Sequence, residues 1–160
     1  MDDIIEAIIT LLETTLGSGY RVVYGRALMP AQSDLPMVCV SPVGTGRKIE
    51  GTGGLNTTVY TIDVVLYVDL KQYMDTADNL DIAHQKDLVT IMEARDTTTR
   101  VPLATSIFGA LEANPQLGNL VDILETPEIS YSADAQQIVG SYVVPATIRL
   151  VYNQVLPRCP

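Results

Sequence analysis

Two segments of this chain alternate strictly between apolar and mixed positions, and this alternation constrains the fold more than any other feature. In residues 59–68 every even position is apolar, and the same holds for residues 142–152. A period of two residues is typical of a β-strand with one buried face. Both segments exceed the five or six residues of a usual strand. The sequence therefore predicts two long strands, each with one face in the core.

The odd-numbered faces of these strands are only half polar. Valines stand there beside Asp63 on the first strand and Arg149 on the second. A sheet with an apolar core face and a half-apolar outer face is expected to bind a second partner on that outer face. This favours the subunit of an assembly over an enzyme. If the strands are neighbours, Asp63 and Arg149 would pair across them, as an exposed pair worth at most about 1 kcal/mol or as a pair that sets register at a subunit interface. Two unrelated solvated charges are the alternative.

The composition predicts one soluble domain that spans residues 1–160. Of the 160 residues 47% are hydrophobic, with one Phe and no Trp, so the core would consist of Val, Ile and Leu. Ten basic and 19 acidic residues give a net charge of −9, which disfavours a nucleic-acid-binding protein because such proteins need clustered Lys and Arg. The first residues lack a basic region, and no apolar run approaches the roughly 20 residues of a membrane span. We expect a cytosolic protein without a membrane partner.

The order of predicted elements is helix, strands, two helices, strands. Helical spacing of apolar residues predicts helices at about 3–16, 76–95 and 103–113. Strands are predicted at 21–24, 37–43, 59–68, 120–124, 128–132 and 138–152. This order is typical of an α+β fold with a mostly antiparallel β-sheet and helices packed on one face. Pro42 predicts that its strand lies at an edge or ends there, and Pro145 predicts an edge position or a bulge.

A glycine-rich segment connects two of the predicted strands. Residues 44–54 contain five glycines in eleven positions. We expect them to form the mobile tip of a long β-hairpin loop, longer than a hairpin needs, with Arg47, Lys48 and Glu50 near the tip. A loop that orders against a neighbouring subunit is a further interpretation. A phosphate-binding loop is disfavoured because the G-x-x-x-x-G-K-[ST] spacing is missing and no helix follows.

The predicted helix at 76–95 carries a second apolar line. Ile82 and Val89 lie seven residues apart, on the side opposite the core stripe. In a small domain such a line indicates a partner surface. His84 and Asp87 share a face of the same helix. Without a positioned nucleophile, a solvated helix flank is favoured over catalysis by this pair.

No constellation of residues predicts a catalytic, cofactor or metal site. One His and two distant Cys residues do not supply the usual zinc ligands, and no EF-hand pattern occurs. Cys39 lies in an apolar run and is interpreted as a small buried hydrophobe. Cys159 is next to last, and a disulfide between the two cysteines stays open. We therefore expect no enzyme activity and no cofactor.

The order of these elements follows a known pattern over nearly the whole chain. An amphipathic helix comes first, residues 35–40 enter a strand, and a glycine-rich hairpin leads into the long strand at 60–68. Helices follow, and a closing strand ends at 146–152. In this organisation the chain resembles the tail terminator (tail-completion) proteins of long-tailed bacteriophages. The likeness is one of hydrophobic patterns and not of invariant residues.

The resemblance implies a structural virion protein of the tail and neck, assembled in the host cytoplasm. Such a protein forms a ring, typically a hexamer, that caps the head-proximal end of the tail tube and contacts the tube protein and the connector or neck protein. DNA would pass through the lumen without specific binding, and an acidic lumen would let it slide, which the net charge of −9 fits. The family has no catalytic residues to transfer. The candidate residues for the subunit or tube interface are Arg47, Lys48, Glu50, Asp63, Ile82, Val89 and Arg149.

Two alternatives stay open at this point. Another neck component, such as a head-completion or connector subunit, would touch the portal side instead of the tube. From a different class, a small cytosolic enzyme or ligand-binding domain would need a convergent polar pocket, and no constellation in the sequence suggests one.

Overall fold

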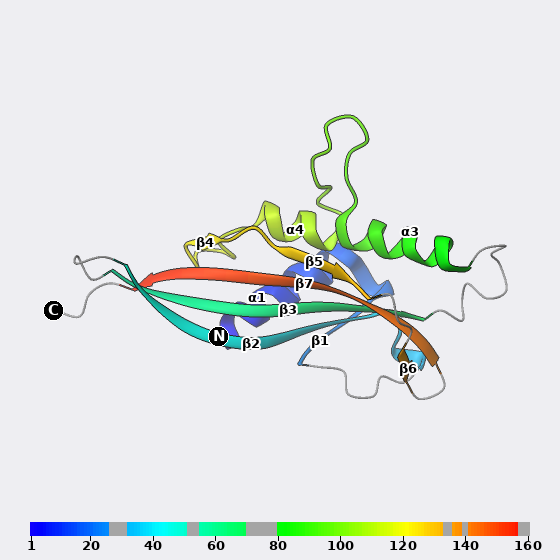
Figure 1. Ribbon diagram of the computed structural model, residues 1–160, viewed down its shortest axis with the longest axis horizontal. Helices are drawn as coiled ribbons and strands as arrows, with labels where there is room; N and C mark the ends of the chain where they lie inside the picture. The colour runs from blue at the N-terminus through cyan, green and yellow to red at the C-terminus, as the bar shows by residue number, and fades with distance from the viewer. Residues whose placement is uncertain (26–31, 51–54, 70–79, 133–135, 139–140, 157–160) are drawn as a thin grey trace.

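A sheet built around three long strands organises the molecule (Figure 1). The computed structural model describes the chain except for residues 26–31, 51–54, 70–79, 133–135, 139–140 and 157–160. The fold is α+β, as predicted. The described elements are α1 (Asp2–Leu16), η1 (Gly17–Gly19), β1 (Arg21–Tyr24), η2 (Gln32–Asp34), β2 (Met37–Glu50), β3 (Leu55–Asp69), α3 (Leu80–Glu93), α4 (Ile107–Ala113), β4 (Ile123–Leu124), β5 (Glu128–Tyr131), β6 (Gln136–Ile138) and β7 (Ser141–Leu156).

The two strands with strict alternation are neighbours in this sheet. The strand order is β1-β2-β3-β7-β4, and β5 and β6 also pair with β7. Among the described pairs, β1 with β2 is parallel and the others are antiparallel. The register of β3 and β7 sets Ile62 opposite Leu150 and Asp63 opposite Arg149. Even positions of both strands therefore share one face, and odd positions share the other.

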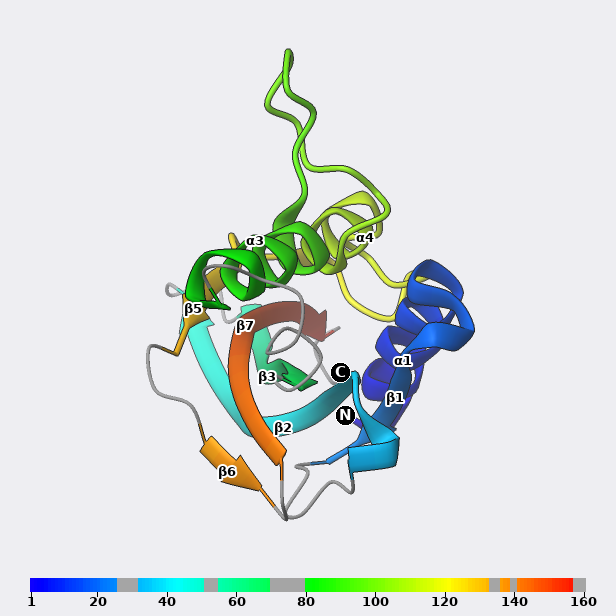
Figure 2. The same cartoon turned by 90° about the vertical axis from the view of Figure 1, so that its right-hand side faces the viewer.

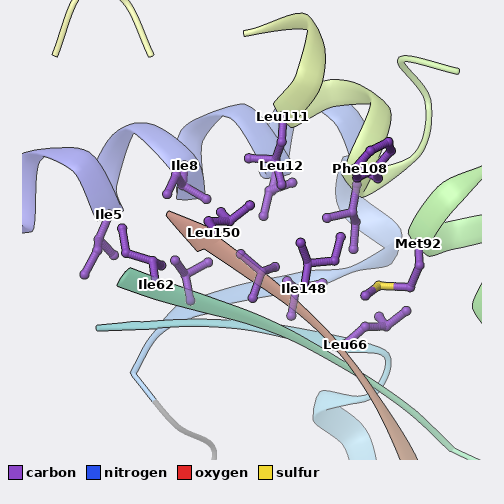
Figure 3. Close-up of a cluster of buried hydrophobic side chains, with 14 of the residues drawn as sticks. Ile5, Ile8, Leu12, Ile62, Leu66, Met92, Phe108, Leu111, Ile148 and Leu150 are labelled. Atoms are coloured by element: carbon purple, nitrogen blue, oxygen red, sulfur yellow. The ribbon is translucent and has the colours of Figure 1, made fainter. Parts of the chain in front are cut away.

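The core lies between the even face of the sheet and the α-helices. Ile62, Leu66, Ile148 and Leu150 are fully buried there. Figure 3 shows them facing side chains from α1, α3 and α4. Each fully buried Leu or Ile contributes about 1.5–3 kcal/mol relative to an exposed one. The labelled helical residues of this cluster are Ile5, Ile8, Leu12, Met92, Phe108 and Leu111.

The first helix forms where it was predicted. Its apolar stripe of Ile5, Ile8 and Leu12 is fully buried. This packing offsets the entropy that the chain loses when the helix forms. Asp2 and Asp3 lie in the first turn, at the positive end of the helix dipole. The helix stops before Gly17, whose φ of 69° is a backbone conformation that glycine adopts without strain.

The other two helices differ from prediction, the one predicted at 76–95 at its end and the one predicted at 103–113 at its start. Residues 76–79 lie outside the described residues, and α3 is described from Leu80 to its end at Glu93. The helix predicted from residue 103 begins at Ile107, because the Ser106 hydroxyl caps it by accepting a hydrogen bond from the Gly109 N–H. Leu103 instead donates its N–H to the Ala94 carbonyl at 2.7 Å.

The strands β2 and β3 are longer than predicted, and this corrects the expected hairpin loop. Within residues 44–54, the seven residues from Gly44 to Glu50 are strand, paired from Gly44 opposite Thr61 to Glu50 opposite Leu55. The prediction of a loop is therefore wrong for this part. β3 supplies the pairing groups that these glycines need, and a β-bulge between Pro42 and Gly44 absorbs one extra residue. Residues 51–54 lie outside the described residues.

The two prolines have different outcomes. Beyond Val40 no described strand pairs with β2 on its β1 side, so Pro42 lies at a sheet edge as predicted, although the strand does not end there. The prediction of an edge for Pro145 is wrong, because β7 lies between β3 and the short strands β4, β5 and β6. The Pro145 carbonyl accepts from the Ser132 N–H at 3.1 Å, so its nitrogen faces the same side, just beyond the end of β5. The missing N–H therefore interrupts no described pair of strands.

The remaining strands are found close to their predicted places. β1 has its predicted bounds, whereas β4 begins three residues later than predicted and β5 ends one residue earlier. The last strand was predicted at 138–152, but Ile138 belongs to β6, which pairs with the start of β7, and β7 runs from Ser141 to Leu156. None of the helices that the structure describes combines the length and apolarity needed to cross a membrane.

The Tyr152 hydroxyl provides a test of this core. It is buried and has no hydrogen-bond partner in the described part of the chain, and burial raises the pKa of the phenol. Because the folded state disfavours the ionised phenolate, its ionisation costs no stability below the unfolded pKa of about 10, and the fold loses stability as the pH rises above that value. We expect Tyr152→Phe to equal the wild type at neutral pH or exceed it by up to about 1 kcal/mol, and to lose less stability between about pH 9 and 11, as measured by urea unfolding.

Tyr60→Phe is the matched control. Tyr60 lies opposite Tyr152, but its hydroxyl donates to Gln154 Oε1 at 3.0 Å. Losing that bond should cost about 0.5–1.5 kcal/mol. Equal losses for the two variants at neutral pH would contradict this description of Tyr152.

Candidate subunit interface

An ion pair lies on the outer face of the sheet, which we define as the face that carries the odd-numbered residues of β3 and β7. Arg149 Nε donates to Asp63 Oδ1 at 2.9 Å, and Arg149 Nη2 donates to Asp63 Oδ2 at 3.2 Å. The Asp63 side chain is 11% exposed and the Arg149 side chain 50% exposed. The predicted cross-strand pairing is therefore confirmed, and its two parallel bonds fix the guanidinium in one orientation. Whether the pair lies at a subunit interface stays a prediction.

The ion pair belongs to a polar row that crosses four strands. Ser41 of β2 lies opposite Asp63, and Glu128 of β5 lies opposite Arg149 on its other side. The hydrogen bonds and charge of Asp63, with a smaller contribution from Glu128, raise the pKa of Arg149 further above its usual range. The buried Ser41 hydroxyl has no hydrogen-bond partner among the described residues. The row holds a permanent cation at a fixed place on a half-apolar face.

The surroundings of this row on the outer face are partly apolar. Val59, Val65 and Val151 are half-buried, and Val155 is 46% exposed. The three α-helices of the described chain pack on the opposite face (Figure 2). Cys39, on the same side near the start of β2, is buried as expected, whereas Cys159 lies outside the described residues. The outer face therefore offers both apolar contact and a directed charge to a partner.

Three predicted site residues lie on the extended part of β2. The bulge shifts the alternation, so Lys48 pairs with Thr57 and lies on the outer face, while Arg47 pairs with Thr58 and lies on the other. Lys48 Nζ is 3.5 Å from Glu125 Oε1. The pKa of Glu125 is lowered, first by the hydrogen bond from the Asn153 amide at 2.8 Å and then by Lys48. For Glu50 the structure describes only the backbone, which pairs with Leu55.

The helical part of the predicted interface lies elsewhere. Val89 of α3 is 42% exposed, while Leu88 and Met92 of the same helix are buried in the core. Val89 therefore points away from the core, as the second apolar line predicts. Ile82 lies on α3, but its side chain is outside the described residues. Because α3 covers the helical face of the sheet, the structure does not bring Val89 together with the ion pair.

The sequence did not predict the structure of the segment that follows α3. The stretch between the helices predicted at 76–95 and 103–113, for which the sequence predicts no element, forms an ordered hairpin that projects from the body (Figure 1). Its signal in the sequence is Asp96 followed by Thr98 and Thr99, a pattern in which a carboxylate accepts bonds from nearby backbone N–H groups. The pattern is short and common, and nothing in its composition predicts that the segment leaves the body.

Comparison with known proteins adds no family to this picture. No protein-family model matches the sequence, and no curated protein matches it either. Among the described residues, no three His, Cys, Asp or Glu side chains gather closely enough to hold a metal ion. The His84 side chain lies outside that set. The function of this chain must therefore be inferred from its fold and from the surfaces described above.

Removing the cation of the ion pair should expose its structural role. We expect Arg149→Met to lower the urea midpoint of unfolding, because it leaves the nearly buried Asp63 carboxylate without its partner. Replacing both residues, as Asp63→Leu with Arg149→Met, should recover part of the loss, since an apolar pair leaves no charge uncompensated. A double-mutant cycle measured by urea unfolding gives the coupling between the two side chains.

Arg47→Met is the control for this cycle. Arg47 is an exposed cation of the same sheet with no ion pair among the described residues. It should leave the midpoint unchanged. Unfolding midpoints that agree for Arg149→Met and Arg47→Met would argue against a structural role of the pair.

Proposed function

We propose that this chain is the ring-forming subunit of a phage tail terminator. In this proposal six copies cap the head-proximal end of the tail tube, contact the tube protein and the connector, and let DNA pass through the lumen. The protein is a structural component of the virion, without catalytic residues. The likeness in element order supports this proposal, and the α+β architecture of the structure is compatible with it.

The observation that carries the proposal is the outer face of the sheet. In the described structure it is half apolar, bears the Asp63–Arg149 pair and lies away from the α-helices. In a monomer nothing covers this face of the described structure, so Val155 and the half-buried Val59 and Val151 stay in contact with water. Packing this face against a neighbouring subunit or the tube would bury those side chains. The oriented Arg149 would then set the angle of approach.

Charge supports the same proposal. A net charge of −9 gives the chain an excess of carboxylates, and six copies in a ring multiply it. A lumen lined with carboxylates repels the phosphates of DNA and lets the duplex slide without binding. A protein that grips DNA would need the opposite charge balance.

The molar mass of the purified protein tests this proposal. We expect light scattering to give six times the 17.4 kDa mass of the chain, and negative-stain images of the same peak to show rings with a central hole. Arg149→Glu should weaken the ring more than it weakens folding, because repulsion by Asp63 turns the side chain away from its place at the interface.

Glu112→Arg is a charge change on the exposed surface of α4 that should leave the ring intact. A wild-type protein that stays monomeric up to millimolar concentration, and also when mixed with purified tail tubes, would overturn the ring proposal. An unchanged elution volume for dilute Arg149→Glu would remove Arg149 from the interface but leave the ring.

A further inference from the structure

The connection between α3 and α4 forms an arm, which we define as residues 94–103. Figures 1 and 2 show it standing out from the helices, away from the sheet. Its two sides are held together by hydrogen bonds from the Asp96 N–H to the Val101 carbonyl at 2.9 Å and from the Leu103 N–H to the Ala94 carbonyl at 2.7 Å. The arm is therefore an ordered projection.

The tip of the arm is fixed by one carboxylate. Asp96 Oδ1 accepts hydrogen bonds from the Thr98 N–H at 2.9 Å, the Thr99 N–H at 2.6 Å and the Thr99 hydroxyl at 3.0 Å. These bonds, with the Thr99 backbone first, lower the pKa of Asp96. Arg100 follows with a φ of 62°, a left-handed conformation that is costly for a residue other than glycine. A strained residue held in one conformation is typical of a functional surface.

The base of the arm is tied to the body through Arg95. Its guanidinium lies 5.6 Å from the centre of the Phe108 ring of α4, and its Nη1 donates to the Arg100 carbonyl at 3.3 Å. Its Nη2 is 3.5 Å from Glu93 Oε2, and the other oxygen, Glu93 Oε1, accepts a hydrogen bond from the Tyr131 hydroxyl at 2.7 Å. The arm is thus held in one orientation by α3, α4 and β5, and a pre-organised arm loses less entropy on binding.

The arm presents the features of a contact surface. Val101 is 59% exposed and Leu103 40% exposed. Arg100 is exposed, and no carboxylate pairs with its side chain in the part of the chain that the structure describes. Two exposed apolar side chains beside an arginine without a carboxylate partner among the described residues fit a binding partner that supplies both an apolar surface and a carboxylate.

A groove of that chemistry exists on another side of this molecule. It is an open cavity of about 420 Å³ between the end of α1, η1, β1 and η2. Glu13 lines it as an exposed carboxylate without an ion pair among the described residues, and Leu35 and Pro36 contribute apolar wall. Arg21 and Asp34, which form an ion pair with each other, also line the cavity. In Figure 2 the arm and β1 lie on different sides of the molecule, so a chain does not reach its own groove.

We infer that the arm of one copy docks in the groove of the next copy, with Arg100 paired to Glu13. The inference rests on the proposed ring and names the contact that closes it. Because arm and groove are different surfaces, the contact is head-to-tail, the type that builds a ring when the rotation closes. Val101 and Leu103 would lie against the Leu35 and Pro36 wall.

Charge reversal tests this contact by light scattering and negative-stain imaging. Arg100→Glu and Glu13→Arg each place like charges in the contact, and each should raise the concentration for half-assembly by about tenfold or more. The double variant Arg100→Glu with Glu13→Arg restores opposite charges and should regain the ring. An equal mixture of the two single variants should also form rings, in which the two chains alternate.

Controls keep the outcome unambiguous. Glu112→Arg makes the same charge change on α4, outside the groove, and should assemble like the wild type. Circular dichroism checks each fold, and Arg100→Gln or Glu13→Gln replaces any variant that unfolds, with a smaller rise in the concentration for half-assembly expected. Rings from both single variants at the wild-type concentration would overturn the arm contact and leave the proposed function standing. A wild-type protein that forms no ring, either alone up to millimolar concentration or with purified tail tubes, would overturn both, and failure of the double variant and of the mixture to recover would overturn the direct Arg100–Glu13 pairing.

Discussion

The register between β3 and β7 is the constraint on which the rest of the structure depends. The pairing runs from Asn56 opposite Leu156 to Asp69 opposite Val143, and side chains alternate along its whole length. A slip of β3 by one residue would move its apolar set to the outer face and carry Asp63 toward the core. The two bonds between Asp63 and Arg149 oppose such a slip, because they form only when these residues lie opposite each other. The α-helices cover the face that this register makes apolar, and β4, β5 and β6 attach to the far side of β7.

Features encoded by local periodicity were predictable from the sequence, and features that depend on distant partners were not. The alternation of β3 and β7 and the stripe of α1 lie within single segments, so these elements contain most of the residues that the sequence predicts for them, although β3 begins four residues earlier and β7 ends four residues later than predicted. The glycines after Pro42 have the local composition of a loop, yet β3 pairs with them and makes them a strand. The position of Pro145 inside the sheet likewise depends on where β5 ends, which no window around Pro145 contains.

The same distinction between local and distant contacts applies to the candidate site. The pairing of Asp63 with Arg149 was predictable because two alternating strands of similar length are natural neighbours, and one charge on each odd face then has one obvious partner. The exposure of Val89 followed from helical spacing. The arm was not predictable, because its order comes from Arg95 contacting Phe108 and from Glu93 contacting Tyr131, residues that only the fold brings together.

The bulge in β2 gives one strand two opposite patterns. Before it the odd residues Cys39 and Ser41 lie on the outer face, and after it the even residue Lys48 lies there. If the same sequence ran on from Pro42 as a regular strand, with Val43 paired and no bulge, the core up to Val40 would stay but every residue beyond would exchange faces. Arg47 would then lie on the outer face, and the contact of Lys48 with Glu125 would be lost. The bulge thus determines the charge pattern that the far end of the sheet presents, while the hydrophobic core before it stays in place.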